Sequence, residues 1–132
     1  PGTTVAAWMD AHRRDVFAAA YRVDAAAIPP GTARLVEVAA PTVDAPGPTL
    51  ERWRAAGVRP GVICGDGAVL FEAVVARQAR VLPAPPLAPI LAALALDAHA
   101  AGLTMAPAAV QPLYVRRPDA EVARETRAAL EP

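Results

Sequence analysis

The fold is decided first by residues 4–23, which read TVAAWMDAHRRDVFAAAYRV. Two runs within this stretch, residues 4–10 and 15–23, are dominated by apolar, β-branched and aromatic side chains, and only a short polar connector separates them. Short connectors between such runs are typical of a β-hairpin. Residues 33–38 alternate in polarity and predict a third strand, reached through a turn at residues 29–31. We therefore expect three antiparallel strands to open the domain.

Helical and strand patterns alternate in the rest of the chain. In order, they predict a short helix capped by Thr49 and closed by Gly57, a strand at residues 61–64, a helix over residues 68–78, a strand at residues 80–82 and a helix from Leu87 to Gly102. The strand at residues 61–64 is wholly apolar, which favours burial on both of its faces. The last helix carries the longest apolar run, which is too short to cross a bilayer, so we expect this helix to be buried in the protein.

Composition excludes several kinds of chemistry. The 132 residues contain no Ser, Asn or Lys, which rules out a serine triad, a P-loop lysine and a Schiff-base lysine. The 13 basic residues are balanced by 13 acidic ones, so we expect no autonomous binding of nucleic acid. The lone Cys64 cannot form an internal disulfide, and no secretory signal is recognisable, which favours a reducing cytoplasm and no membrane attachment.

The most suggestive constellation is Gly65-Asp66-Gly67, which lies between an apolar strand and a predicted helix. Exposed amides at such a turn can hold a phosphate, so these three residues are a weak candidate for cofactor binding. The turn lacks the third glycine of a dinucleotide fingerprint and the lysine of a P-loop, and Asp66 would repel a phosphate. We therefore favour a structural role, with Asp66 as the N-cap of the following helix.

The other reactive side chains predict no catalytic site. Asp10 and Asp66 are too few carboxylates for a metal site of the nuclease type, and Asp10 is expected to pair with a nearby arginine. His12 and His99 have no second ligand at helical spacing, which leaves a metalloprotease without support. Cys64 has no histidine placed in sequence to activate it. We predict no catalytic residue, no metal ligand and no cofactor.

Three separated blocks carry a family resemblance: residues 9–17 (MDAHRRDVF), residues 63–67 (ICGDG) and residues 110–116 (VQPLYVR). They resemble, in the same order, a hairpin, a glycine turn after a strand and a terminal proline-x-tyrosine-leucine-arginine motif in the C-terminal half of the TsaB family, also called YeaZ or glycoprotease-like. Two positions depart from the family's pattern. His12 stands where the family commonly has Arg, and Val115 stands where it has Leu.

The resemblance implies the architecture. The predicted order, three strands followed by helix, strand, helix, strand and helix, is that of a ribonuclease-H-like fold. The family has actin-like and sugar-kinase-like (ASKHA) lobes, which implies a mixed five-stranded α/β sheet with helices on both faces. Residues 1–117 would form the C-terminal lobe and residues 118–132 a polar tail, while the glycine-rich N-terminal lobe would lie outside this fragment.

The resemblance also implies a function. It predicts a non-catalytic scaffold in the biosynthesis of tRNA N6-threonylcarbamoyladenosine, whose partners are TsaD and the ATPase TsaE. Tyr114 would have a structural role, and Arg116 and Arg117 would be exposed contacts. A face left uncovered could let the chain self-associate. The alternative is a nucleotide-binding lobe of an ASKHA-type ATPase or kinase, with residues 65–67 touching ATP; the old peptidase label finds no support in these residues.

Overall fold

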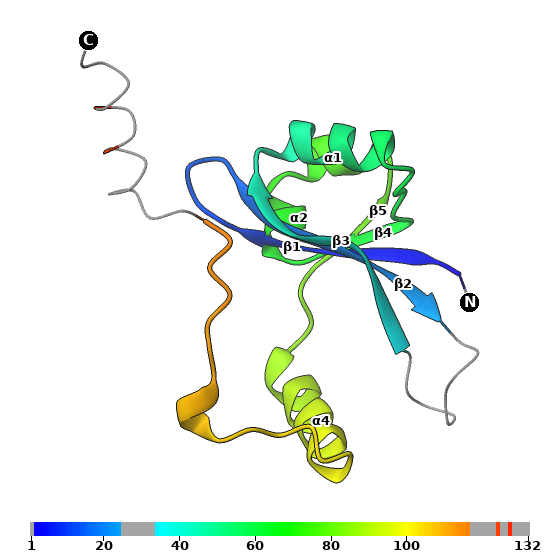
Figure 1. The fold of residues 1–132 in the computed structure, drawn as a ribbon. Coiled ribbons are helices and arrows are strands. Elements are labelled where there is room, and N and C mark those ends of the chain that lie inside the picture. The colour runs from blue at the N-terminus through cyan, green and yellow to red at the C-terminus, as the bar shows by residue number, and fades with distance from the viewer. Residues whose placement is uncertain (1, 25–33, 117–123, 125–126, 128–132) are drawn as a thin grey trace.

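A computed structural model describes residues 2–24, 34–116, 124 and 127 (Figure 1). The predicted turn at residues 29–31, Arg117 and nearly all of the predicted polar tail lie outside the described residues. The elements are β1 (Thr4–Asp10), β2 (Val16–Asp24), β3 (Arg34–Asp44), α1 (Pro46–Ala55), β4 (Val62–Cys64), α2 (Asp66–Leu70), α3 (Glu72–Val75), β5 (Arg80–Leu82), α4 (Leu87–Ala100) and the short 3-10 helix Pro107–Ala109.

The five strands form one mixed sheet in the order β3-β2-β1-β4-β5. The strands β1, β2 and β3 pair antiparallel, and β4 and β5 continue the sheet parallel to β1. The predicted hairpin is confirmed, with Trp8 opposite Ala18. The chain is therefore an α/β protein built on a five-stranded mixed sheet, as expected.

The third strand is longer than its alternating pattern indicated, because it continues through Pro41 to Asp44. β3 is the edge strand next to β2, and the pairing register shifts between Ala18 and Ala20, opposite the proline. A proline has no N–H to give to a ladder, so it is tolerated at a bulge on an edge strand. Pro41 therefore does not end this strand.

Helix α1 begins earlier than expected. Two prolines lie in its first turn, where a missing amide costs nothing, and Ala45 is its N-cap. Thr49 is not the cap. It is buried, and its hydroxyl donates a hydrogen bond to the Ala45 carbonyl at 2.9 Å. The expected end is confirmed, because Gly57 has a left-handed φ of 76° and the Val58 N–H bonds back to the Trp53 carbonyl at 2.8 Å.

The single helix expected over residues 68–78 is wrong. The structure has two short helices, α2 and α3, which join at Phe71, where φ is −109°. Each of them gives one buried apolar side chain to the core, Ala68 from α2 and Val75 from α3. The interruption at Phe71 therefore leaves two short helices, α2 and α3, that both pack against the same core.

The core lies on one face of the sheet. Residues alternate between faces along a strand, and β1 turns Ala6 and Trp8 to the side where α1, α2 and α3 lie. Trp8 packs against Trp53 of α1 with ring centroids 6.1 Å apart and planes tilted by 60°. The buried cluster consists of Ala6, Trp8, Val16, Ala18, Ala20, Leu50, Trp53, Ile63, Ala68 and Val75.

Helix α4 contradicts two expectations. We expected a buried helix, but α4 has no buried residue, and its Leu96 is 70% exposed. We also expected helices on both faces of the sheet, whereas α1–α3 share one face and α4 stands away from the other (Figure 1). As a result, β4 is not buried on both sides: Ile63 is buried, while Val62 and Cys64 are half-buried. Of the helices that the structure describes, none is long and apolar enough to span a membrane.

Candidate functional site

The candidate site lies where two parallel neighbours, β1 and β4, end at the same edge of the sheet. Asp10 closes β1, and the turn Gly65-Asp66-Gly67 follows β4 and opens α2. Ligands of α/β proteins commonly bind outside the carboxyl ends of parallel strands, which makes this edge the natural place to look for a site.

Both glycines of the turn are required by close packing against β1. Gly65 has a φ of 124°, and a Cβ placed on it would overlap the carbonyl of Trp8. A Cβ on Gly67 would lie 2.8 Å from the carbonyl carbon of Met9. The backbone of the turn therefore lies directly on the backbone of β1, in a position that side chains cannot share.

Asp66 holds this contact together. Its Oδ1 accepts hydrogen bonds from the N–H of Asp10 at 3.1 Å and from the N–H of Gly67 at 2.8 Å. The N-cap of α2 is Gly65, so the expectation that Asp66 would be the cap is wrong, and Asp66 is instead the first helical residue. A carboxylate there also suits the positive end of a helix dipole. Asp66 thus makes backbone hydrogen bonds within the turn and to β1, in place of the capping role predicted for it.

Asp10 pairs with His12, where the sequence predicted an arginine partner. Its Oδ1 accepts the His12 N–H at 2.8 Å, and its Oδ2 lies 3.3 Å from His12 Nδ1. The His12 side chain is 87% exposed, as expected for a surface turn. The aspartate takes this partner because the chain folds back on it within two residues.

The hairpin turn beyond Asp10 is strained. His12, Arg13 and Arg14 have φ values of 60°, 55° and 69°, a left-handed conformation that side chains with a Cβ rarely adopt. The turn is closed by two backbone bonds, from Asp15 N–H to the His12 carbonyl at 3.0 Å and from Ala11 N–H to the Asp15 carbonyl at 3.1 Å. Asp10 adds a third bond, so the side chain helps to offset the strain.

An apolar hollow of about 310 Å³ adjoins the turn. It lies between the ends of β1 and β4 and the start of α4, and its lining includes Met9, Cys64, Pro85 and Leu87. The Cys64 thiol is engaged with the backbone, donating to the Ala6 carbonyl at 3.4 Å. Within the described ranges, no three His, Cys, Asp or Glu side chains gather closely enough to hold a metal ion.

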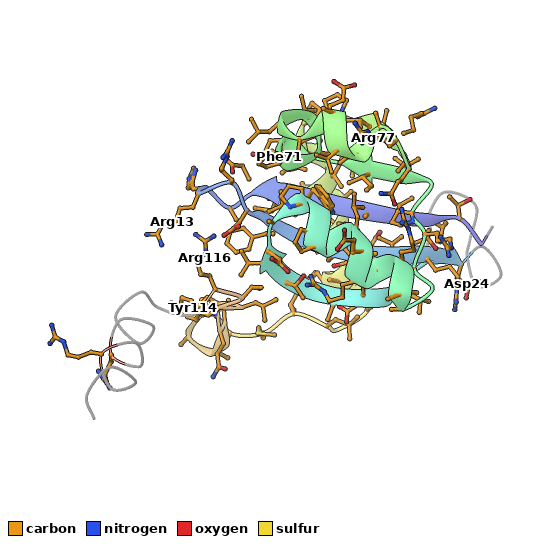
Figure 2. The ribbon with its side chains drawn as sticks, turned by 90° about the horizontal axis from the view of Figure 1, so that it is seen from above. Arg13, Asp24, Phe71, Arg77, Tyr114 and Arg116 are labelled. Atoms are coloured by element: carbon orange, nitrogen blue, oxygen red, sulfur yellow. The ribbon has the colours of Figure 1, made fainter. Side chains whose placement is uncertain are left out.

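The terminal motif has its roles reversed relative to expectation. Tyr114, for which the resemblance implied a structural role, is 82% exposed. Arg116 instead makes the structural contact: it donates to the Asp15 carboxylate at 2.7 Å and lies over the Phe17 ring, 5.9 Å from its centroid. Figure 2 shows Arg116 beside the hairpin turn that also carries Arg13. Sequence reasoning missed this contact because it joins residues about a hundred positions apart.

No protein-family model and no curated protein matches the chain. Among solved structures, it is similar to the crystal structure of an uncharacterized protein from Pseudomonas aeruginosa that is described as having similarity to the peptidase YeaZ. The two are 26% identical and superpose with a TM-score of 0.57, over 87% of this chain and 50% of that one. This chain therefore spans about half the length of that structure, and its fold is consistent with a YeaZ-like protein.

Proposed function

We propose that this chain is a ribonuclease-H-like lobe of a TsaB-type protein. In this role it is a non-catalytic scaffold that works with TsaD and TsaE in forming threonylcarbamoyladenosine on tRNA. The observation that carries the proposal is the similarity to a YeaZ-like structure over 87% of the chain. The element order, three strands, a helix, a strand, a broken helix, a strand and a helix, agrees with the ribonuclease-H-like succession.

The geometry of the candidate site supports a scaffold. The Asp66 carboxylate accepts hydrogen bonds from two backbone N–H groups, and Asp10 pairs with His12. Their hydrogen bonds join the end of β1 to the start of α2 and to the hairpin turn. In this proposal the two aspartates stabilise the edge of the sheet. The lobe then contributes a binding surface for its partners and no reacting group.

The alternative, a nucleotide-binding lobe, would use the same turn. A phosphate at residues 65–67 would need free amides, whereas the Gly67 N–H donates to Asp66 and the Gly65 N–H donates to the Leu82 carbonyl at 3.0 Å. The Asp66 carboxylate would also face the phosphate with like charge. These contacts favour the scaffold over the ATP-binding lobe, and cofactor binding by Gly65, Asp66 and Gly67 stays a prediction.

The test is reconstitution with the longest natural protein that contains this chain. That protein is mixed with TsaD and TsaE, complexes are captured through a tag on TsaD, and threonylcarbamoyladenosine on tRNA is measured by mass spectrometry. The proposal expects capture and modification that depend on this protein, with no ATP bound by the protein alone. Stoichiometric ATP binding without capture would replace the proposal by the alternative.

A further inference from the structure

A continuous groove follows helix α1 on the side of the sheet that faces away from α4 (Figure 1). It is made of two adjoining hollows of about 220 and 340 Å³. Leu50, Arg54 and Gln78 line both hollows and so form the middle of the groove. We call this depression, between α1 and the segment from α3 to the start of β5, the α1 groove.

The groove exists because small residues stand on both of its sides. Gly47, Leu50, Glu51 and Arg54 are spaced three or four positions apart, so they share one face of α1. A Cβ on Gly47 would meet nothing within 4 Å, which leaves that end of the face open. Ala73 is the small residue on the α3 side. Short side chains therefore leave the space between α1 and α3 open.

The floor of the groove is apolar and rigid. Leu50, Trp53 and Ile63 line it, and each belongs to the buried core, with at most 5% of its surface exposed. Val74 adds an apolar side chain that is 38% exposed. Packed core side chains hold their positions, so an occupant meets a preformed surface and little free energy is lost in rearranging it.

The rim of the groove is positively charged. Arg54, Arg59 and Arg77 line it and are exposed, and among the described residues that line the groove Glu51 alone is acidic. In the described part of the chain, no carboxylate forms an ion pair with any of these three arginines. Arg52, on another face of α1, is by contrast paired with a carboxylate of β3 at 2.7 Å. The chain as a whole has no net charge, so this excess is local.

We infer that the α1 groove binds a short, extended and acidic peptide segment of a partner protein. The planar guanidinium of arginine pairs with a carboxylate through two parallel hydrogen bonds, which suits a rim of three arginines to acidic side chains. In an extended peptide, successive side chains point to opposite sides. Apolar residues that alternate with acidic ones therefore reach the floor, while the carboxylates reach the rim.

The length of the groove fits such a segment. Helix α1 has 10 residues, and at a rise of about 1.5 Å per residue it is about 15 Å long. An extended peptide rises about 3.3 Å per residue, so about five residues span this distance. So small a contact lies below the size of a stable protein interface, and we expect a dissociation constant of about 10–500 μM.

An RNA strand, the other common polyanion, fits the groove less well. Single strands bind largely through bases that stack on exposed aromatic rings. Trp53 is the one aromatic residue of the described lining, and it is only 3% exposed. We therefore favour the peptide, and an RNA probe distinguishes the two.

The groove is separate from the candidate site. Residues 58–60 and 78–79, which line it, directly precede β4 and β5. These two strands are parallel, so the groove opens at the edge where they begin, whereas Gly65-Asp66-Gly67 lies at the edge where β4 ends. The inference therefore concerns a different surface and does not rest on the proposed function.

The first test is fluorescence anisotropy with the longest natural protein that contains this chain and labelled probes at low ionic strength. The main probe is the pentapeptide Asp-Leu-Glu-Leu-Asp, and its controls are Lys-Leu-Lys-Leu-Lys, Asp-Gly-Glu-Gly-Asp and a ten-nucleotide oligouridylate. Arg54→Gln with Arg77→Gln removes two cations from the rim. Arg14→Gln with Arg22→Gln is the matched control, because it removes the same charge at two exposed positions outside the groove. Circular dichroism confirms that each variant is folded.

We expect saturable binding of the acidic leucine peptide. Its dissociation constant should rise about tenfold in the rim variant and less than about twofold in the control variant. The lysine peptide should not bind, and the glycine peptide should bind more weakly because it has no apolar side chain for the floor. No saturable binding of the acidic leucine peptide would overturn the inference. So would oligouridylate that binds more tightly than the peptide and is lost in the rim variant, because the groove would then be a nucleic-acid surface.

The second test asks whether the hollow itself is used. Ala73→Trp fills the space between α3 and α1 without changing any charge, at a position that is exposed. The acidic leucine peptide should bind at least about tenfold more weakly to this variant. Ala40→Trp, at an exposed position of β3 outside the groove, is the matched control and should leave binding unchanged. Full binding by Ala73→Trp would show a general attraction of charge in place of a groove and would overturn the inference.

Discussion

Gly65 lies against the carbonyl of Trp8 so closely that no side chain can stand between them. Trp8 is at the same time the largest fully buried side chain of the core, packed on Trp53. The turn that looked most like a phosphate site is thus joined to the core through the backbone of β1. The glycines that suggested phosphate binding are accounted for by this close approach.

Gly65→Ala should therefore destabilise the protein strongly. The added Cβ meets backbone that cannot move without shifting β1, and alanine also strains at a φ of 124°. We expect a loss of about 2–4 kcal/mol in the free energy of unfolding, measured by urea titration. Gly47→Ala is the matched control, since it lies in α1 with nothing within 4 Å of its Cβ, and it should be neutral or stabilise by up to about 1 kcal/mol. Equal effects of the two changes would refute this explanation.

The hydrogen bonds of Asp66 predict that two substitutions at this position will lower the stability of the protein by different amounts. Asp66→Ala leaves the N–H groups of Asp10 and Gly67 without their acceptor and should cost about 1–3 kcal/mol. Asp66→Asn keeps an oxygen acceptor and should cost clearly less. Thermal unfolding of both variants at neutral pH distinguishes them, and an asparagine variant as unstable as the alanine variant would show that the charge matters more than the bonds.

Arg116 should contribute more to the stability of the protein than the exposed Tyr114 does. Its contacts with Asp15 and Phe17 are half-buried, so Arg116→Ala should cost about 0.5–1.5 kcal/mol and increase hydrogen exchange around the hairpin turn. Tyr114→Ala, at a side chain that is 82% exposed, should change the stability by less than about 0.5 kcal/mol. The reverse order would support the structural role that the family resemblance implied for Tyr114.

Asp44 makes the stability of the folded protein depend on pH in the acid range. The hydrogen bond from Arg52 at 2.7 Å, together with the Ala45 N–H at 2.8 Å, lowers the pKa of Asp44 below its ordinary value of about 3.8. Because the folded pKa is the lower one, this stabilisation is present above about pH 4 and is lost as the pH falls through the folded pKa. The pair is solvent-exposed, so its contribution is a few tenths of a kcal/mol.

Asp44→Asn should therefore lower the melting temperature slightly at pH 7 and reduce its fall below about pH 4. Melting curves between pH 3 and pH 7 measure both effects. Glu51→Gln, on the exposed side of α1, is a control that should leave the acid slope nearly unchanged. An acid slope identical in Asp44→Asn and in the unchanged protein would contradict the assignment.

Local patterns predicted the elements better than they predicted their packing. The first hairpin followed from two apolar runs, and Gly57 marked the end of α1, because both signals act within a few residues. The break at Phe71 and the strand through Pro41 depend on neighbours that are distant in sequence, so a single window could not show them. Apolar content predicted a buried α4, yet where a helix docks is decided by tertiary contacts.

In the candidate site too, the sequence predicted which residues lie together but not their long-range contacts. Gly65, Asp66 and Gly67 were singled out from the sequence, and they do lie together at the end of β4. What the residues could not show is that Asp66 reaches the backbone of Asp10, 56 positions earlier, and that Arg116 reaches Asp15. Such contacts follow from the sheet order, which brings β1 between β2 and β4.

The most direct measurement of the central claim is the threonylcarbamoyladenosine content of tRNA in cells depleted of the protein that contains this chain. The scaffold account predicts that the modification falls severalfold, and that it is restored by the unchanged protein and by the Asp66→Asn variant, since no step of chemistry depends on that carboxylate. A modification level that stays unchanged on depletion would contradict the account.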